Sequence, residues 1–371
     1  MRWPVLLMAR ALGIGGSERQ LTEIAKTLDC ARFEPRAGCF RLEGLRALEL
    51  ADAGVPIVHF PVMSFASAGA ISGAWQFVRY IRRHKIKVVQ TFDYPSTVFA
   101  VPLARFFTSA VVVSSQRSHR DLIPPGYRRL VRMTDRLVDA VVVNCQYLKR
   151  HLENDEHVPV ARIQLCYNGV DLDAFHTMDV PRPPELPPGA LVIGVVCALR
   201  PEKGLSTLLE GFARVRSSRA GMKLAIVGSG PVLNPLQSEA RALGIFEDCV
   251  FVPATAQVTT WLRAIDIFVL PSLSEAFSNS LMEAMACGCC AVATRVGGNP
   301  EVVRDGETGL SFEPGDSEGL SVVLRTLIEN EALRQRLAAA GAELINQRFS
   351  TRAAADRMAE IYTYLIEPSG K

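Results

Sequence analysis

The sequence predicts an α/β protein of two domains, each built on a parallel sheet that is covered by helices on both faces. Short apolar, β-prone runs alternate with amphipathic helical segments along the 371 residues, which is typical of βαβ units. The length exceeds the roughly 250–300 residues at which a single hydrophobic core stops growing. Five prolines between residues 181 and 188 separate two such series, as a stiff linker between domains does.

The N-terminal domain is expected over residues 1–180. It begins with an apolar strand at residues 5–9, a glycine turn at 13–16 and a helix, an arrangement in which backbone N–H groups approach a phosphate. Glu18 stands where a dinucleotide fingerprint needs a third glycine, which argues against a Rossmann dehydrogenase. Later strands are expected at residues 36–40, 55–60, 87–91, 110–115 and 140–144, alternating with helices near 42–53, 70–84, 94 onward, 128–137 and 147–152.

The C-terminal domain is expected over residues 190–350, and a closing helix over 351–367. Strands are predicted at residues 191–197, 223–227, 249–252, 267–270, 289–293 and 309–312, with helices near 205–212, 281–286, 317–329 and 331–347. In the closing helix Ala354, Met358, Ile361 and Leu365 recur at helical spacing, so one face is expected to be buried.

Composition narrows the classes of function. A net charge of +3 does not indicate a nucleic-acid partner. No apolar run reaches the length of a transmembrane helix, and the first residues run directly into a glycine turn, so we interpret them as a strand and not a signal peptide. Nine cysteines lie mostly in apolar segments, as reduced thiols in a cytoplasmic protein do.

Residues 266–301 form the stretch around which the second half is organised. A buried strand ends at Pro271, a small polar loop follows, and a helix beginning near residue 280 leads to a second strand and the turn Gly297-Gly298. The helix N-terminus therefore lies at the carboxyl end of a strand, where α/β sheets bind ligands and where free N–H groups favour an anion. Ser278, Asn279 or Ser280 is expected to cap this helix.

Two carboxylates flank this helix start. Glu275 in the loop and Glu283 in the first helical turn would repel a phosphate but would accept hydrogen bonds from sugar hydroxyls. Each also has a simpler interpretation: Ser280 and Glu283 fit a capping box, and Glu275 fits a solvated loop acid. A ligand that carries both phosphates and sugars would explain why carboxylates flank an anion site.

Basic residues complete the pattern. Arg200 and Lys203 follow a strand at the same expected sheet edge, where two cations neutralise a diphosphate and stabilise it as a leaving group. His119 lies just past the carboxyl end of another strand, although a lone loop histidine is also a common surface residue.

Two metal-like patterns are better explained by structure. Asp171 and Asp173 follow the turn signal Asn168-Gly169, which favours turn and cap roles. The group Cys287-Gly-Cys289-Cys290 has no second cluster at zinc spacing, which favours core packing. No metal site is predicted.

With these residues in view, the whole chain resembles the family 4 (group 1) glycosyltransferases, which have the GT-B fold. The strongest motif is Glu275-x7-Glu283 between Pro271 and Gly288. The supporting motifs are Gly13-Ile-Gly-Gly-Ser-Glu-Arg, Asn168-Gly-Val-Asp, Arg200-Pro-Glu-Lys-Gly, Val227-Gly-Ser-Gly-Pro and Gly297-Gly-Asn-Pro-Glu. The resemblance implies two Rossmann-like domains whose parallel sheets face across a central cleft, with the C-terminal helix crossing back to the N-terminal domain.

The resemblance also implies an activity, namely sugar transfer from a nucleotide-diphosphate sugar, such as a UDP- or GDP-sugar, to an acceptor hydroxyl. The anomeric configuration would be retained, with no required metal and no cofactor. Glu283 would bind the ribose hydroxyls, Glu275 the hydroxyls of the donor sugar, and Arg200 with Lys203 the pyrophosphate. His119 matches the family's active-site histidine near the transferred sugar. Backbone contacts to the donor are implied for Gly15, Gly16, Val252, Phe277, Ser278, Asn279 and Ser280.

One motif departs from the family pattern. The family's first basic residue commonly stands five or six positions before the lysine, where this chain has Ala198 or Cys197. Arg200 is only three positions before Lys203. Either Arg200 reaches the same phosphate from a shifted position, or Lys203 carries the contact alone.

Two other functions remain open: a nucleotide-sugar epimerase or isomerase on the same fold, and a non-catalytic partner subunit. The acceptor is expected to be a sugar or a lipid-linked glycan, in surface polysaccharide or lipid-linked glycan synthesis. Basic residues around Arg82 and Arg128 are mixed with Trp75, Phe77 and Tyr80. They suit an anionic membrane surface, although a solvated amphipathic helix explains them equally. A cytoplasmic protein, peripheral on the cytoplasmic face of the membrane, is therefore expected.

Overall fold

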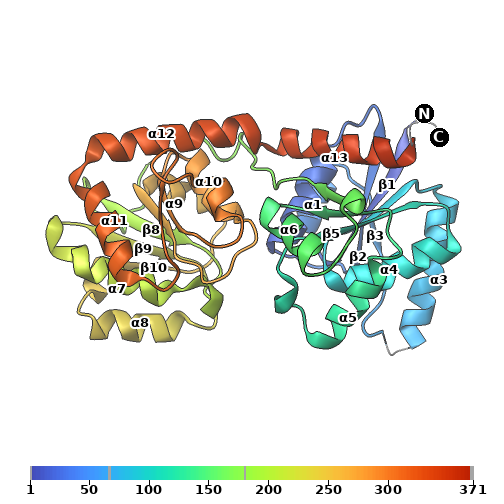
Figure 1. Ribbon diagram of the computed structural model, residues 1–371, viewed down its shortest axis with the longest axis horizontal. Helices are drawn as coiled ribbons and strands as arrows, with labels where there is room; N and C mark the ends of the chain where they lie inside the picture. The colour runs from blue at the N-terminus through green and yellow to red at the C-terminus, as the bar shows by residue number, and fades with distance from the viewer. Residues whose placement is uncertain (1, 66–67, 179–180, 368–371) are drawn as a thin grey trace. The chain divides into compact units, whose positions relative to one another are not determined.

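The computed structural model describes residues 2–65, 68–178 and 181–367 (Figure 1). The chain forms two compact units. The first consists of Met1–Gly169 with Thr351–Lys371, and the second is Val170–Ser350.

The segment between the two units differs from the expected linker. Residues 181–188 belong to the second unit, because Leu186 is buried there and the Arg182 guanidinium lies 3.5 Å from the Asp266 carboxylate. Val170 already donates a backbone hydrogen bond to Phe349. The chain therefore passes between units at Gly169 and at Ser350, and the proline-rich segment is packed against a domain instead of linking two. Residues 179 and 180, where the expected first domain ends, lie outside the described residues.

The first unit contains a seven-stranded parallel sheet in the order β3-β2-β1-β4-β5-β6-β7. Its strands are β1 (Trp3–Ala11), β2 (Phe33–Arg41), β3 (Ile57–His59), β4 (Val88–Thr91), β5 (Val111–Gln116), β6 (Ala140–Val143) and β7 (Ile163–Leu165). The α-helices are α1 (Gly16–Thr27), α2 (Leu45–Asp52), α3 (Ala68–Arg83), α4 (Tyr94–Phe107), α5 (Pro125–Thr134), α6 (Gln146–Asn154) and α13 (Thr351–Ile366). The three-residue strand β7 was not predicted, because so short a run carries no detectable alternation.

The core of the first unit joins segments from both ends of the chain. The fully buried residues Val5 and Leu7 of β1 pack with Leu21 of α1 and with Met358 and Tyr362 of α13. Figure 1 shows α13 lying beside α1. The Tyr362 hydroxyl donates to the side-chain oxygen of Gln90 in β4, and this bond satisfies two polar groups inside the core.

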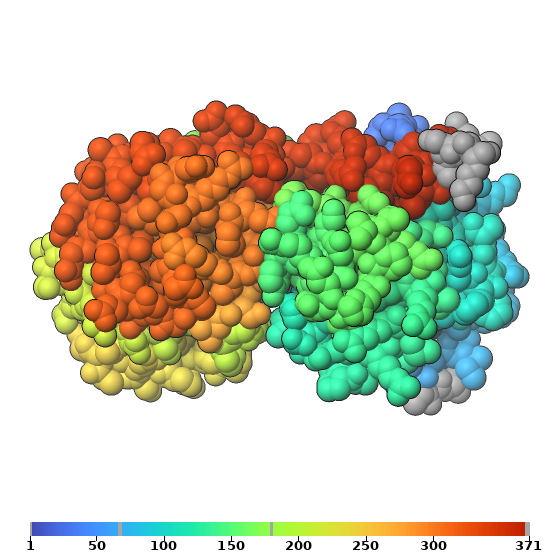
Figure 2. Space-filling model, in the orientation of Figure 1, coloured from blue at the N-terminus to red at the C-terminus, as the bar shows by residue number. Residues whose placement is uncertain are grey.

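The second unit contains a six-stranded parallel sheet in the order β10-β9-β8-β11-β12-β13. Its strands are β8 (Val192–Val196), β9 (Lys223–Val227), β10 (Cys249–Val252), β11 (Ile267–Leu270), β12 (Cys290–Thr294) and β13 (Leu310–Phe312). The α-helices are α7 (Leu205–Val215), α8 (Leu233–Ala242), α9 (Val258–Ala264), α10 (Asn279–Ala286), α11 (Ser317–Glu329) and α12 (Glu331–Arg348). On the face shown in Figure 2, the orange-red residues of α11 and α12 form much of this unit's surface.

Both sheets reverse their strand order at one point, and this reversal places the candidate residues. The reversal falls between β1 and β4 in the first unit and between β8 and β11 in the second. Ligands of open α/β sheets bind outside the carboxyl ends of the strands at such a point. The prediction of two α/β domains with parallel sheets is therefore confirmed. The loops after the strands at each reversal are the expected ligand-binding loops.

Candidate functional site

In the second unit, Lys203 and Glu275 meet at the point where the strand order reverses. Lys203 ends the short 3-10 turn Pro201–Lys203 after β8, and Glu275 lies in the loop after β11. The Lys203 ammonium forms an ion pair with the Glu275 carboxylate, and both side chains are largely buried. The Ser272 hydroxyl also donates to Glu275, over 3.4 Å. The two loops thus hold a cation and an anion side by side where a charged, hydroxyl-rich ligand would bind.

Two glycines allow these loops to approach so closely. Gly204 has φ +59°, and a Cβ there would lie 2.3 Å from the Pro271 carbonyl oxygen. Gly297 has φ +56°, and its Cβ would lie 1.8 Å from the carbonyl oxygen of Glu275. Side chains at either position would be strained by φ and would collide with backbone. The predicted Gly297-Gly298 turn therefore supports the Glu275 loop.

Helix α10 begins directly after this loop. Ser278 is its N-cap and accepts a hydrogen bond from the Leu281 N–H over 3.4 Å. Asn279 is consequently the first helical residue, and Glu283 is the fifth. A capping box requires the acid at the third helical position, so the simpler interpretation of Glu283 is wrong. Glu283 is 4% exposed, which places a carboxylate in the interior beside the helix start.

Arg200 does not join the Lys203–Glu275 pair. Its side chain is 63% exposed, and the ion pair it makes within the described chain is with Glu202, at 3.9 Å.

The residues predicted to contact the donor around the start of α10 are partly or fully buried. Phe277 is buried and contacts Phe349, with ring centroids 5.7 Å apart. Asn279 and Ser280 are half-buried on the first turn of α10, and the Ser280 hydroxyl lies 3.3 Å from the Ser278 hydroxyl.

Val252 ends β10, at the same edge of the sheet. Its carbonyl oxygen accepts a hydrogen bond from the Gly228 N–H over 2.8 Å, so one of its two acceptor positions is already used. A ligand would have to use the second.

The two metal-like patterns have structural roles. The Asp171 carboxylate accepts from the backbone N–H groups of Asp173 and Ala174, as the predicted turn requires. Cys287, Cys289 and Cys290 are buried, and burial raises the pKa of the Cys287 and Cys290 thiols to about 12. Within the described part of the chain, no group of three or more His, Cys, Asp and Glu side chains is arranged to hold a metal ion.

In the first unit, the glycine turn lies after β1. Gly15 is the N-cap of α1, no side chain caps this helix, and Gly15 and Gly16 are both exposed. The carboxylate of Glu18 lies next to Gly15, since a Cβ on Gly15 would be 2.3 Å from a Glu18 oxygen. Burial raises the pKa of Glu18. An anion approaching this turn would therefore encounter Glu18, which would have to move or be protonated.

His119 lies in the loop after β5 and contacts a second histidine. Its ring centroid is 3.9 Å from that of His151 in α6. Its Nδ1 lies 3.3 Å from the Asp121 backbone nitrogen and 3.2 Å from the Asp121 carboxylate, so Asp121 holds this edge of the ring in either tautomer. His151 Nδ1 lies 2.7 Å from the Asp155 carboxylate. Burial lowers the pKa of His119, and the neighbouring His151 lowers it further, so His119 is neutral at pH 7.

Arg120 anchors this loop in the interior. It is 1% exposed and forms ion pairs with Asp135, at 2.8 Å, and with Glu156, at 3.0 Å. Arg132 also binds Glu156, at 2.6 Å. Burial tends to raise the pKa of Glu156, but the two arginines outweigh it and lower that pKa to about 2. The buried ion cluster therefore fixes the residue adjacent to His119.

A His151→Phe substitution is expected to raise the pKa of His119, because phenylalanine keeps the ring contact but removes the imidazole that lowers this pKa. Because the His119 pKa is lower in the folded state than in the unfolded state, protonation of His119 favours unfolding. The free energy of unfolding therefore falls as pH falls below roughly 6.5. Below this pH, the His151→Phe variant should lose less of its free energy of unfolding than the wild type does. Histidine NMR titration checks this, with His157→Asn as the control. An unchanged His119 pKa would contradict it.

Comparisons with known proteins define the class. The family model described as Glycosyltransferase Family 4 matches residues 14–174, and the one described as Glycosyl transferases group 1 matches residues 179–344. Together they cover most of both units. The chain belongs to the family 4 (group 1) glycosyltransferases.

The alignments with curated relatives cover only part of each relative's length. A D-inositol 3-phosphate glycosyltransferase of Streptomyces scabiei is 32% identical over 288 residues, which are 71% of this chain and 63% of the relative. The lipopolysaccharide core biosynthesis glycosyltransferase LpsE of Rhizobium meliloti is 34% identical over 154 residues, 42% of this chain and 44% of the relative. The chain therefore spans less than two thirds of these relatives.

Solved structures share the fold over nearly the whole chain. A glycosyltransferase from Rickettsia africae has a TM-score of 0.85 at 19% identity, covering 99% of this chain and 100% of that one. HepE of Anabaena, in complex with UDP and glucose, also has a TM-score of 0.85, at 21% identity, with 98% and 100% covered. At these identities the likeness shows the fold, which is GT-B.

Some residues of the site were not predicted from the sequence. Ser272, which contacts Glu275, directly follows β11 and its proline, and that position at a strand's carboxyl end was the available signal. His151 gave no signal, because its contact with His119 joins α6 to the loop after β5. Such a pairing depends on tertiary packing alone.

Proposed function

We propose that the protein is a retaining glycosyltransferase, which moves a sugar from a nucleotide-diphosphate sugar to an acceptor hydroxyl without a required metal. The observation that carries this proposal is the Lys203–Glu275 pair beside the start of α10, with Glu283 buried in that helix. Family membership supports it, and so does the similar fold of HepE, whose structure contains UDP and glucose.

In the proposed reaction each of these groups has a separate task. Lys203 neutralises charge on the departing diphosphate, and the N-terminal N–H groups of α10 add to this stabilisation. Glu275 and Glu283 accept hydrogen bonds from hydroxyls of the donor sugar and the ribose. Arg200, whose exposed side chain is free to turn, would reach the diphosphate only by leaving Glu202, so we assign the main contact to Lys203.

The neutral ring of His119 suits a role beside the transferred sugar, because a neutral imidazole would exchange hydrogen bonds with a sugar hydroxyl without adding a charge. If His119 has this role, His119→Ala should lower kcat and leave nucleotide binding unchanged.

The reaction is tested by following nucleotide sugars by proton NMR, alone and with sugar alcohols or lipid-linked glycans, in the presence of a chelator. A released nucleotide diphosphate and a new glycoside of unchanged anomeric configuration would support transfer. Conversion of the sugar without acceptor would indicate an epimerase or isomerase. A folded protein that binds no donor would indicate a non-catalytic subunit.

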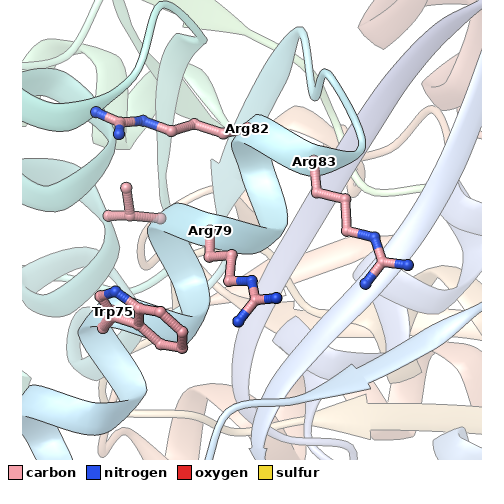
Figure 3. Close-up of a pocket in the computed structure, with 5 residues that line it drawn as sticks. Trp75, Arg79, Arg82 and Arg83 are labelled. Atoms are coloured by element: carbon pink, nitrogen blue, oxygen red, sulfur yellow. The ribbon is translucent and has the colours of Figure 1, made fainter.

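We also propose that α3 binds an anionic membrane surface, where a lipid-linked acceptor for surface polysaccharide or related glycan synthesis would be found. A hollow of about 490 Å³ on this helix is lined by Trp75, Val78, Arg79, Arg82 and Arg83 (Figure 3). Trp75 is 61% exposed, and the Arg79 guanidinium stacks over its ring at 4.9 Å. An exposed aromatic ring flanked by cations suits a membrane interface.

The structure narrows the residues expected to contribute. Phe77 is fully buried, and Tyr80 packs on Phe60 and accepts a hydrogen bond from Arg36, so neither is free to enter a lipid surface. Arg82 donates two hydrogen bonds to the Phe107 carbonyl oxygen at the end of α4. Among the described helices, none combines the length and apolar character needed to cross a membrane.

Replacing Arg79 and Arg83 with glutamine is expected to weaken binding to phosphatidylglycerol vesicles by roughly 30-fold, at about 1 kcal/mol per basic residue. Vesicle sedimentation at low ionic strength measures this. The matched control replaces Arg219 and Arg325, which are exposed in the second unit, and should bind as the wild type does. Equal binding by both double variants, or no binding by the wild type, would refute the proposal.

A further inference from the structure

Arg117 holds an unusual position at the carboxyl end of β5 in the first unit. Its Nη1 donates to the Asn168 side-chain oxygen over 2.6 Å. Its guanidinium carbon lies 4.9 Å from the centroid of the Phe92 ring, which follows the neighbouring strand β4. Both contacts come from loops at the same edge of the sheet, so the guanidinium is fixed in place there.

This cation has no counter-ion in the described chain. No ion pair involving Arg117 occurs among the residues the structure describes, whereas Arg120, three residues later, has two carboxylate partners. The titratable groups that act on it are Cys166 and Tyr362. Burial raises the pKa of both, so both are neutral at pH 7. Burial also lowers the pKa of Arg117 to about 10, which still leaves it charged.

The free groups of Arg117 lie on one edge of the guanidinium. Its Nε is shielded from solvent and has no hydrogen-bond partner. No hydrogen bond from its Nη2 occurs among the described residues either, and Nη2 is not one of the solvent-shielded unpaired atoms, so an anion from solvent reaches this edge at Nη2. Nε and Nη2 together form the planar two-donor edge that binds carboxylate or phosphate oxygens in parallel. A partly buried, uncompensated charge costs free energy, which an anion on this edge would recover.

We propose that Arg117 binds an oxyanion, a phosphate or carboxylate group, on the acceptor substrate. The inference rests on the proposed transferase function, and it names the acceptor's chemical class. The acceptor is favoured over the donor because the Lys203–Glu275 pair and α10 assigned to the donor belong to the second unit. Arg117 belongs to the first unit and precedes His119, the residue assigned beside the transferred sugar, by two positions.

The first test measures anion binding without any turnover. Arginine Nε–Hε NMR signals of the full-length protein are followed while inorganic phosphate, or separately acetate, replaces chloride at constant ionic strength. The Arg117 signal, assigned with Arg117→Lys, is expected to shift saturably. The signal of Arg105, which is paired with Asp139, is the control. An Arg117 signal that moves no more than the control would overturn the proposal, whether or not the protein is a transferase.

The second test compares acceptors that differ in one anionic group, such as a sugar phosphate and the same sugar without phosphate. Arg117→Gln should lower kcat/KM for the charged acceptor on the order of 10–100-fold, as loss of a charged hydrogen bond does, and should leave the neutral acceptor and donor affinity unchanged. Arg117→Lys should retain part of the preference. Equal losses for both acceptors, or weaker donor binding, would overturn the assignment.

Discussion

Replacing Lys203 with alanine is expected to lower kcat by roughly 10²–10³-fold, the effect of removing one group that stabilises developing charge. In the proposed reaction the diphosphate gains negative charge as the glycosidic bond breaks, and the Lys203 ammonium is already placed at that edge of the sheet by its pair with Glu275. Its loss also leaves the Glu275 carboxylate without a counter-charge, which adds repulsion toward the departing diphosphate.

Steady-state kinetics and donor titrations separate the two effects of this substitution. A loss mainly in kcat indicates stabilisation of the transition state, and a loss in donor affinity alone indicates uniform binding. Lys223→Ala is the matched control, because Lys223 lies at the amino end of β9 and binds the Glu247 carbonyl oxygen. If Lys203→Ala has no larger effect than this control, the assignment of Lys203 to the leaving group is wrong.

Replacing Arg120 with leucine is expected to lower the free energy of unfolding by about 3–5 kcal/mol, because two carboxylates lose their buried partner. Asp135 is itself buried, and burial raises the pKa of its carboxyl despite the contact with Arg120. Glu156 would keep only Arg132. Denaturant unfolding measures this loss, and Arg105→Leu, which breaks a more exposed pair with Asp139, should cost no more than about 1 kcal/mol.

The pH dependence of this loss has a definite sign. In the wild type the pKa of Glu156 is lowered to about 2, so its stabilisation is present above its unfolded pKa and is lost as pH falls toward 2. In the Arg120 variant the Asp135 carboxyl, whose pKa burial already raises, loses its counter-charge and is stabilised by protonation at low pH. The two proteins should therefore approach each other in stability as pH falls. A gap that stays constant, or is no larger than the Arg105 control, would contradict the buried-cluster account.

The part of the site that the sequence predicted is the part carried by one contiguous segment. The unit formed by β11, its loop, α10 and β12 is encoded by an apolar run, a proline, small polar residues and a glycine, and the structure confirms it. The loops of Lys203 and Glu275 were expected at one sheet edge because both follow parallel strands. The structure adds that they are in contact.

Other features depend on contacts between distant segments. Helix α9 has seven residues and no side-chain cap, so local propensity gave it no signal. The proline-rich segment resembled a linker, yet Leu186 and Arg182 pack it onto the second unit. The isolated charge of Arg117 becomes evident only when Phe92, Asn168 and Cys166 are brought around it. Composition and spacing do not encode these pairings.

In the proposed transferase, the second unit binds a nucleotide-sugar donor through Glu283 and Lys203. Isothermal titration of UDP-, GDP- and ADP-sugars into the wild type and Glu283→Gln, without divalent metal, tests it most directly. We predict that one nucleotide binds the wild type clearly better than the others, and that Glu283→Gln weakens this binding by roughly 10–100-fold while remaining folded. Equal affinities in the two proteins, or no binding by the folded wild type, would contradict the claim.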